Sequence, residues 1–230
     1  MDYKQSIINF CLTRQKENGG FAATPYLPAT LEDTYFSLAT LRKLEVCFSK
    51  LSKTIIFLEK YIEIPLSPRL SFFLKRCLTW LGKNYDPKNI IVSQNPDLEE
   101  IYYLKFLGKR DIEIQLALSS PTVKELYFLA ELAPEKARDF IDYVKKAQNP
   151  DGGFGFFPGT TSFLENTYYA FFFLKKFDEN PIYLKELKHF LFSCFRQGGF
   201  ARAPQGVPFL ESTYFGTSLL VDGNIGTIAN

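Results

Sequence analysis

One string of residues occurs three times in this chain, and the repetition constrains the fold more than any other feature. The shared string is G-G-F-x3-P-x5-L-E-x-T-Y, with the same spacing in every copy. The copies begin at Gly19, Gly152 and Gly198. A string that recurs in this way is typical of repeat architectures, in which each copy buries its apolar surface against its neighbours.

Two kinds of helix are predicted around each copy. Before the second copy, Ala137, Phe140, Ile141 and Val144 follow the i, i+3, i+4, i+7 spacing of one helix face. After the loop, residues 168–174 are apolar on nearly every side, so that helix must be covered on both faces. We expect the two glycines to end the first helix through a left-handed position, and the proline to prevent its resumption.

The middle of the chain lacks the glycines but keeps a charged residue three positions before an aromatic one. The pairs are Arg69/Phe72, Glu99/Tyr102 and Lys124/Tyr127. With the three repeats, they predict six apolar helices that begin near residues 31, 68, 98, 122, 163 and 209. Six amphipathic segments are predicted between them, near 3–15, 49–63, 86–93, 109–119, 135–148 and 181–196.

This alternation predicts an all-α fold of two concentric rings, with the six apolar helices inside and the six amphipathic helices outside. Closure of the ring covers the end repeats, whose faces would otherwise need caps. We expect one domain over residues 1–220. Residues 221–230 are glycine-rich, and we expect them to form a loose tail.

Composition limits the chemistry of the chain. The net charge of +2 and the absence of a basic stripe argue against a nucleic-acid-binding protein. Aromatic residues make up 17% of the chain, whereas histidine occurs once. A single histidine excludes a zinc site rich in histidine and any mechanism that needs two imidazoles, so catalysis would depend on other side chains.

The four cysteines show no C-x-x-C spacing, which favours reduced, mostly buried thiols in an intracellular protein. No apolar run approaches the roughly 20 residues of a membrane span. The N-terminus lacks the pattern of a signal peptide. We therefore expect a cytoplasmic protein that does not cross a membrane.

The second copy and its flanks resemble a known repeat. Gln148-Asn-Pro-Asp-Gly-Gly-Phe-Gly-Phe-Phe-Pro-Gly159, followed by Leu164-Glu-Asn-Thr-Tyr168, is similar to the prenyltransferase/squalene-oxidase repeat. That repeat occurs in the β subunits of protein farnesyl- and geranylgeranyltransferases and in terpene cyclases. The resemblance spans nearly the whole chain, and it implies an α/α toroid of six inner and six outer helices.

The resemblance also allows a test of the family's zinc site. In the protein prenyltransferases, an Asp and a Cys two residues apart, with a His on a later inner helix, hold a catalytic zinc. The matching positions here are Glu165, Thr167 and Glu211. Because neither thiolate nor imidazole is present, we predict no catalytic zinc and no zinc-dependent protein prenylation. A magnesium ion is compatible with the resemblance, but no residue pattern points to one.

The same resemblance suggests a ligand. Tyr168 matches a tyrosine that follows the zinc cysteine, and Lys124 falls near a residue that contacts diphosphate in that family. Arg69 is the other cation at the head of an apolar helix. We expect an isoprenoid, such as a prenyl diphosphate, or a similar lipid in a central aromatic cavity. Its predicted contacts are Tyr35, Arg69, Phe72, Tyr102, Lys124, Tyr127, Tyr168 and Tyr214.

Two other functions are kept open. Asp97-Leu98-Glu99-Glu100 resembles the acidic box of terpene cyclases that begin by protonation, which would make Glu99 the catalytic acid. Alternatively the toroid is a filled, non-catalytic scaffold, or one subunit of a protein complex. In that reading the aromatic side chains fill the core, and Arg69 and Lys124 form ion pairs with Glu99 and with Glu32 or Glu165.

Glutamates at helix starts also have a structural interpretation. A negative charge in the first turn complements the helix dipole, and a Ser or Thr three residues before an acid forms a capping box. Ser162/Glu165, Thr122/Glu125 and Thr30/Asp33 have this spacing.

Overall fold

The structure is a computed structural model that describes residues 2–48, 51–109 and 120–227. It divides into two compact units, Met1–Ile114 and Gln115–Asn230, and each is described by itself. The described residues are helical except for turns, loops and one short antiparallel strand pair, which agrees with the predicted all-α fold. None of the helices in the described part combines the length and the hydrophobicity that a bilayer crossing demands.

The six predicted apolar helices are all present, and their starts lie within about one residue of the prediction. In the first unit they are α2 (Leu31–Lys43), α4 (Pro68–Trp80) and α5 (Leu98–Phe106). In the second unit they are α6 (Val123–Leu132), α9 (Leu164–Lys176) and α11 (Leu210–Val221).

Four of these six helices begin at a side-chain cap, and the other two do not. A side-chain oxygen of Thr30, Ser67, Asp97 or Thr122 accepts a backbone N–H in the first turn of α2, α4, α5 or α6. The predicted capping box of Thr122 and Glu125 is confirmed. The helices α9 and α11 instead follow a phenylalanine and have no side-chain cap.

The amphipathic segments agree with the prediction less completely. Four of them contain helices or helical turns: α1 (Tyr3–Leu12), α3 (Ser52–Glu59), the series α7 (Pro134–Ala137), η1 (Arg138–Phe140) and α8 (Ile141–Lys146), and α10 (Leu184–Ser193). The predicted segment 109–119 falls almost wholly outside the described residues.

The predicted helix at 86–93 is wrong. Leu66 and Ile90 form a parallel bridge, in which Leu66 N–H donates to Asn89 O at 3.2 Å and Ile91 N–H donates to Leu66 O at 2.8 Å. The segment is therefore extended, and its backbone hydrogen bonds are made with Leu66, which precedes α4. Pro87 within it also disfavours a helix, because proline supplies no N–H.

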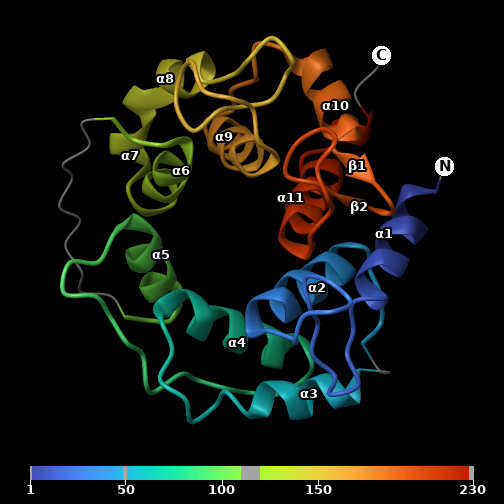
Figure 1. Cartoon of the computed structure of the whole chain (residues 1–230). Helices are drawn as coiled ribbons and strands as arrows, with labels where there is room; N and C mark the ends of the chain where they lie inside the picture. Colours follow the sequence, from blue (N-terminus) through green and yellow to red (C-terminus); the bar gives the residue numbers. More distant parts are fainter. Residues whose placement is uncertain (1, 49–50, 110–119, 228–230) are drawn as a thin grey trace. The chain divides into compact units, whose positions relative to one another are not determined.

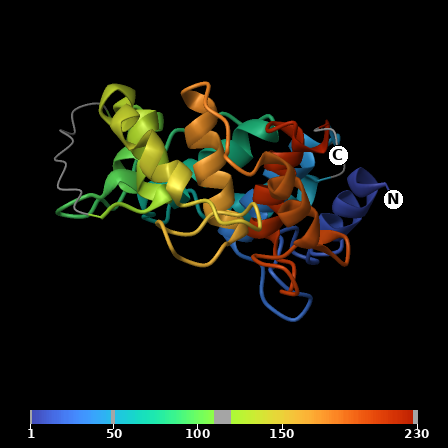
Figure 2. The same ribbon diagram turned by 90° about the horizontal axis from the view of Figure 1, so that it is seen from above.

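In the first unit, α2 packs on α4 and α4 packs on α5, while α1 lies against α2 and α3 against α4 (Figure 1). In the second unit, α9 lies between α6 and α11, with α8 against α9 (Figure 1). The loops that precede α9 and α11 lie at the same end of these helices (Figure 2). The N-termini of α9 and α11 therefore share one end of this unit.

The strand pair and the last helical turn both belong to the second unit. Strands β1 (Phe195–Arg196) and β2 (Gly199–Phe200) form a hairpin, and β2 packs on α11. Val221, at the predicted domain boundary, is the last residue of α11. The turn η2 (Ile225–Thr227) then packs on α11, and Ile225 is fully buried. This burial argues against a loose segment as far as residue 227, while a single domain over 1–220 stays a prediction.

The repeated glycines have a different role from the predicted one. The helix α8 ends at Lys146, before Gly152, through a right-handed residue at position 147, so the glycine does not end the helix. Gly152 has a φ of +89°, and a Cβ there would lie 2.1 Å from the backbone nitrogen of Leu187. Glycine is needed at this position because the loop turns in a left-handed conformation directly against α10.

Candidate functional site

The threonine of each repeat holds its own loop. The hydroxyl oxygens of Thr34, Thr167 and Thr213 each accept the backbone N–H of the repeat phenylalanine at 3.0 Å. In the second repeat the hydroxyl of Thr167 also donates to Phe163 O at 2.8 Å. The side chain of Thr167 is fully buried, and its hydroxyl makes both a donor and an acceptor bond.

These contacts test whether the chain fits the family's zinc. Thr167 occupies the position of the zinc cysteine, but its oxygen is directed to the Phe154 loop. Glu165, at the position of the aspartate, has a carboxylate oxygen 3.9 Å from the guanidinium of Arg202. A hydroxyl committed to the backbone and a carboxylate beside a cation do not fit a zinc site that activates a thiol. That the protein works without zinc stays a prediction.

Arg69 connects two glutamates in the first unit. Its Nη2 lies 2.6 Å from Glu32 Oε1, and its Nε lies 3.6 Å from Glu99 Oε1. The guanidinium carbon is also 5.2 Å from the centre of the Phe73 ring. The predicted ion pairs of Arg69 are therefore present. The role of Glu99 as a catalytic acid stays a prediction.

The predicted aromatic contacts of the first unit form one cluster on α2, α4 and α5. Tyr35 stacks on Phe73 with ring centres 3.8 Å apart, and it lies 6.3 Å from Phe72. Phe72 in turn lies 5.2 Å from the ring of Tyr103. Tyr102 contacts Tyr103, again at 5.2 Å. The structure therefore brings Tyr35, Phe72 and Tyr102 into one aromatic group, with Arg69 at the start of the same helix as Phe72.

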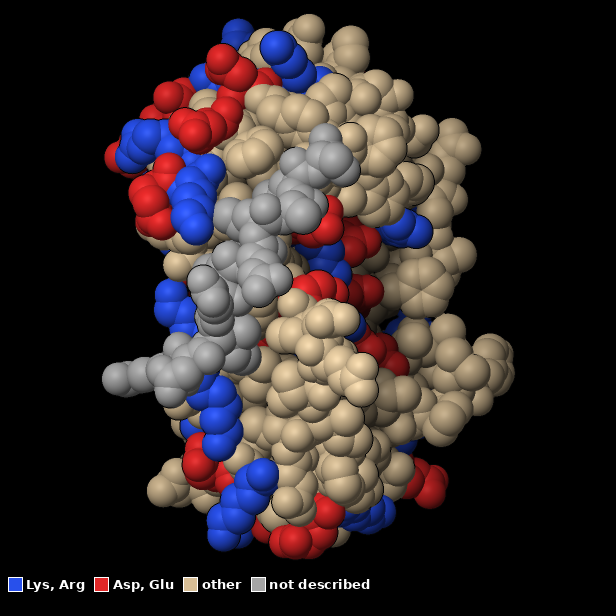
Figure 3. All heavy atoms as spheres, turned by 90° about the vertical axis from the view of Figure 1, so that its left-hand side faces the viewer, with Lys and Arg blue, Asp and Glu red and all other residues tan. Residues whose placement is uncertain are grey.

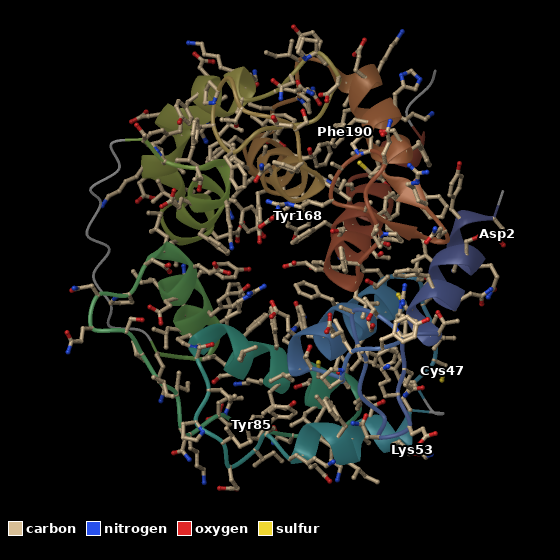
Figure 4. The ribbon with its side chains drawn as sticks, viewed as in Figure 1. Asp2, Cys47, Lys53, Tyr85, Tyr168 and Phe190 are labelled. Atoms are coloured by element: carbon tan, nitrogen blue, oxygen red, sulfur yellow. The ribbon has the colours of Figure 1, made fainter. Side chains whose placement is uncertain are left out.

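The second unit holds a cluster of tyrosines on α6, α9 and α11. Tyr168, labelled in Figure 4, lies between the other two predicted tyrosines. Its ring centre is 6.1 Å from that of Tyr127 and 6.0 Å from that of Tyr214. Burial raises the pKa of Tyr168 well above its ordinary value, and the neighbouring tyrosines and a hydrogen bond with Tyr214 raise it further. The phenol of Tyr168 therefore stays neutral and acts as a hydrogen-bonding group.

Lys124 lies beside this cluster. Its Nζ is 5.8 Å from the centre of the Tyr169 ring and 6.0 Å from that of Phe128. Lys124 is in the first turn of α6, and Tyr169 is in the second turn of α9. A cation over two aromatic faces combines positive charge with apolar surface, which suits an amphiphilic anion.

Two residues of this region were not predicted. Tyr169 contacts Tyr127 at 5.2 Å and Phe215 at 5.7 Å, so it extends the cluster to both neighbouring helices. Arg202 stacks over Phe163 at 4.3 Å in addition to its contact with Glu165. The doubled tyrosine at 168–169 was a signal for the first. No sequence signal pointed to Arg202, because it lies in a loop that is far in sequence from Phe163 and Glu165.

One predicted cap in this region is wrong. The hydroxyl of Ser162 donates to Asp151 Oδ1 at 2.8 Å and does not cap α9. Glu165 therefore belongs to no capping box. Ser162 instead closes the loop of the second repeat, where it also accepts a bond from Asn149 at 2.8 Å.

Comparison with known proteins gives one clear match. A family model described as the prenyltransferase alpha-alpha toroid domain matches residues 1–62 and 114–207, which is more than half of the chain. No curated protein sequence matches the chain.

Proposed function

Because the chain belongs to the prenyltransferase alpha-alpha toroid domain family, we propose that it binds an isoprenoid, such as a prenyl diphosphate, or a similar lipid in an aromatic-lined central cavity. The observation that carries the proposal is the tyrosine cluster of the second unit with Lys124 beside it. The first unit has an aromatic group of its own, Tyr35, Phe72 and Tyr102 with Arg69, which is described by itself.

The tyrosines suit the apolar part of such a ligand. Aromatic faces attract polarisable, unsaturated chains and any positive charge that forms on them. Tyr168, Tyr127 and Tyr214 come from three different helices, so they offer faces in several directions. The hydrogen bond between Tyr168 and Tyr214 satisfies polar groups that would otherwise oppose a hydrocarbon chain.

Lys124 suits the polar part of the ligand. An ammonium group is a common phosphate contact, and its charge-assisted bonds are stronger than neutral ones. Thr122 and Glu125 form the capping box at the start of α6, which fixes the backbone of Lys124 between them. On the face drawn in Figure 3, positive and negative side chains of the described residues are interspersed, and no extended basic surface is seen. This distribution favours a small anionic head group over a polyanion.

The experiment is a binding titration with farnesyl diphosphate, geranylgeranyl diphosphate and farnesol, followed by native mass spectrometry. We expect saturable micromolar binding of at least one diphosphate. Lys124→Gln should lower the affinity for the diphosphates about tenfold and leave the affinity for farnesol nearly unchanged. Tyr168→Ala should weaken all three ligands.

Lys136→Gln is the matched control, because Lys136 is an exposed cation in the same unit. No binding of any of the three at micromolar concentration would refute the proposal. Equal effects of Lys124→Gln and Lys136→Gln would refute the role of Lys124.

Zinc-dependent protein prenylation is not part of the proposal, since the residues at the zinc positions do not fit the metal. The scaffold alternative has one observation in its favour, which is the engagement of Arg69 by Glu32 and Glu99. A scaffold would bind none of the three ligands, so the same titration separates the two functions. Activity as a cyclase would require Glu99 to act as an acid, and it is tested by whether Glu99→Gln abolishes turnover of a polyprenyl substrate.

A further inference from the structure

A pocket lies in the first unit, at the C-terminal end of α4. It has a volume of about 390 Å³, within the range of small-molecule sites. Its walls come from the loop before α3, from α3 and from the end of α4. The lining residues are Phe48, Leu51, Ser52, Ile55, Trp80, Leu81 and Gly82. Arg69 and Trp80 are both on α4 and lie roughly 16 Å apart along the helix axis. The pocket is lined by residues other than those of the cluster that contains Tyr35, and its Trp80 contacts that cluster through Tyr35.

Two cations lie beside the ring of Trp80, just outside the residues that line the pocket. The guanidinium carbons of Arg76 and Arg42 lie 5.2 Å and 5.7 Å from the centre of its ring. Neither arginine makes an ion pair with a carboxylate among the described residues. A guanidinium stacked on an indole keeps its N–H edge free, and this edge matches a carboxylate or phosphate.

The other residues that line the pocket are also compatible with a bound anion. No lining residue is acidic. Ser52 is the first residue of α3, whose N-terminus has no side-chain cap, so the positive end of this helix dipole lies at the pocket. At the end of α4, the carbonyl of Leu78 accepts the N–H of Lys83 at 2.9 Å, which partly neutralises the negative end of that helix. Lys53, labelled in Figure 4, adds a further exposed cation beside Ser52.

The position of the indole is well defined. Trp80 stacks on Tyr35 at 5.6 Å with an interplanar angle of 22°. The ring is thus held by the aromatic core, and the arginines are placed over a fixed surface. An indole held in place, with two cations beside it, needs little reorganisation to bind a ligand.

From these contacts we propose that this pocket binds a small amphiphilic anion, with a short hydrocarbon chain or ring against Trp80 and Ile55 and a carboxylate or phosphate on Arg42 and Arg76. The apolar part displaces water from Phe48, Leu51 and Ile55. The anionic part forms ion pairs with the two guanidinium groups, which have no carboxylate partner in the described structure. The inference does not depend on the proposed isoprenoid site.

The chain contains one tryptophan, so its fluorescence reports on this pocket and on the neighbouring Tyr35, and the arginine variants below separate the two. The experiment titrates the full-length protein with octanoate, octyl phosphate, octanol and octylamine below their aggregation concentrations. We expect a saturable change in Trp80 fluorescence with both anions. Octanol and octylamine should bind at least about tenfold more weakly, which corresponds to the loss of a charge-assisted contact.

Arg42→Gln and Arg76→Gln test the two cations, and Lys60→Gln is the control because Lys60 is an exposed cation at the end of α3. Each arginine variant should lower the affinity for octanoate at least about fivefold without changing the affinity for octanol. Both arginines are exposed, and urea unfolding checks that the variants are folded. Equal affinity for octanol and octanoate, unchanged affinity in both arginine variants, or no saturable signal would each overturn the proposal.

Discussion

The hydroxyl oxygen of Thr167 accepts the backbone N–H of Phe154 at 3.0 Å, and this bond ties α9 to the loop of its own repeat. Thr34 and Thr213 make the same bond to Phe21 and Phe200 at the same distance. The threonine of the repeated string therefore has a structural role in all three copies. In the second copy this is the residue that the resemblance to the repeat family aligns with a zinc cysteine, and the absence of zinc stays a prediction.

The bond of Thr167 should contribute measurably to stability. Thr167→Val keeps the shape but leaves the buried N–H of Phe154 without an acceptor, so we expect a loss of about 1–3 kcal/mol in the free energy of unfolding. Thr167→Ser retains the hydroxyl and should lose less. Urea unfolding monitored by circular dichroism measures both. If the two variants were equally stable, the hydrogen bond would not be the source of the effect.

Gly152→Ala should destabilise the chain strongly. Its φ of +89° disfavours any side chain, and the new Cβ would lie 2.1 Å from the backbone of Leu187. We expect a loss of roughly 3 kcal/mol or more in the free energy of unfolding, because conformational strain adds to a clash. Gly159 is the matched control, since its φ is +85° but a Cβ there meets no atom within 4 Å.

Gly159→Ala should cost only about 1–2 kcal/mol. The comparison isolates the contact between the repeat loop and α10. Similar losses in the two variants would show that α10 does not approach the loop as closely as described.

Tyr168 should make the chain sensitive to alkaline pH. Burial raises its pKa in the folded state above the ordinary value near 10. Above that pH the phenol ionises in the unfolded chain but not in the folded one, so the free energy of unfolding falls as pH rises. The slope from one such group reaches at most about 1.4 kcal/mol per pH unit.

Tyr168→Phe removes this contribution and should flatten the decline above about pH 10. It also removes the bond to Tyr214, which shifts stability without changing the slope. Tyr26→Phe is the control, because the side chain of Tyr26 is 96% exposed. Denaturant unfolding between neutral and alkaline pH measures the slopes, and parallel curves for wild type and Tyr168→Phe would contradict the prediction.

The cysteines should differ sharply in reactivity. Cys47 is exposed, whereas Cys11, Cys77 and Cys194 are buried. Burial raises the pKa of Cys11 and of Cys194 to about 12, and it raises the pKa of Cys77 as well. The reactive thiolate is therefore scarce at these three sites at neutral pH.

We expect iodoacetamide to modify one thiol of the native protein and four in denaturant, counted by intact mass. Cys47→Ser should abolish native labelling. Rapid native modification of a second thiol would show that one of the buried cysteines is accessible.

The sequence predicted the apolar helices well because the repeat fixes their phase. In α9 and α11, the helix starts three residues before the threonine of the string. Even the degenerate middle of the chain kept a charged residue three positions before an aromatic one. The extended segment at 86–93 was missed because its structure depends on Leu66, which is distant in sequence. Hydrophobic periodicity carries no information about such a partner.

The candidate site was predicted in part. Tyr127, Tyr168 and Tyr214 meet because equivalent positions of neighbouring repeats face one another. The ion pairs of Arg69 follow from the same register. The role of Gly152 in turning the loop against α10 and the contact of Arg202 with Glu165 were not predicted. Both depend on how loops approach distant helices, which a local pattern does not encode.

Two backbone hydrogen bonds among the described residues link successive repeats of the second unit. Val123 N–H donates to Phe156 O, and Leu164 N–H donates to Arg202 O, each at 2.8 Å. The acceptor is in both cases the second residue after the repeat phenylalanine.

The direction of these bonds has a consequence for synthesis on the ribosome. The first turn of α6 finds its acceptor only when residue 156 has emerged, and that of α9 only when residue 202 has emerged. The starts of α6 and α9 are therefore each completed by a later part of the chain, and the final repeat completes the tyrosine cluster by supplying Tyr214.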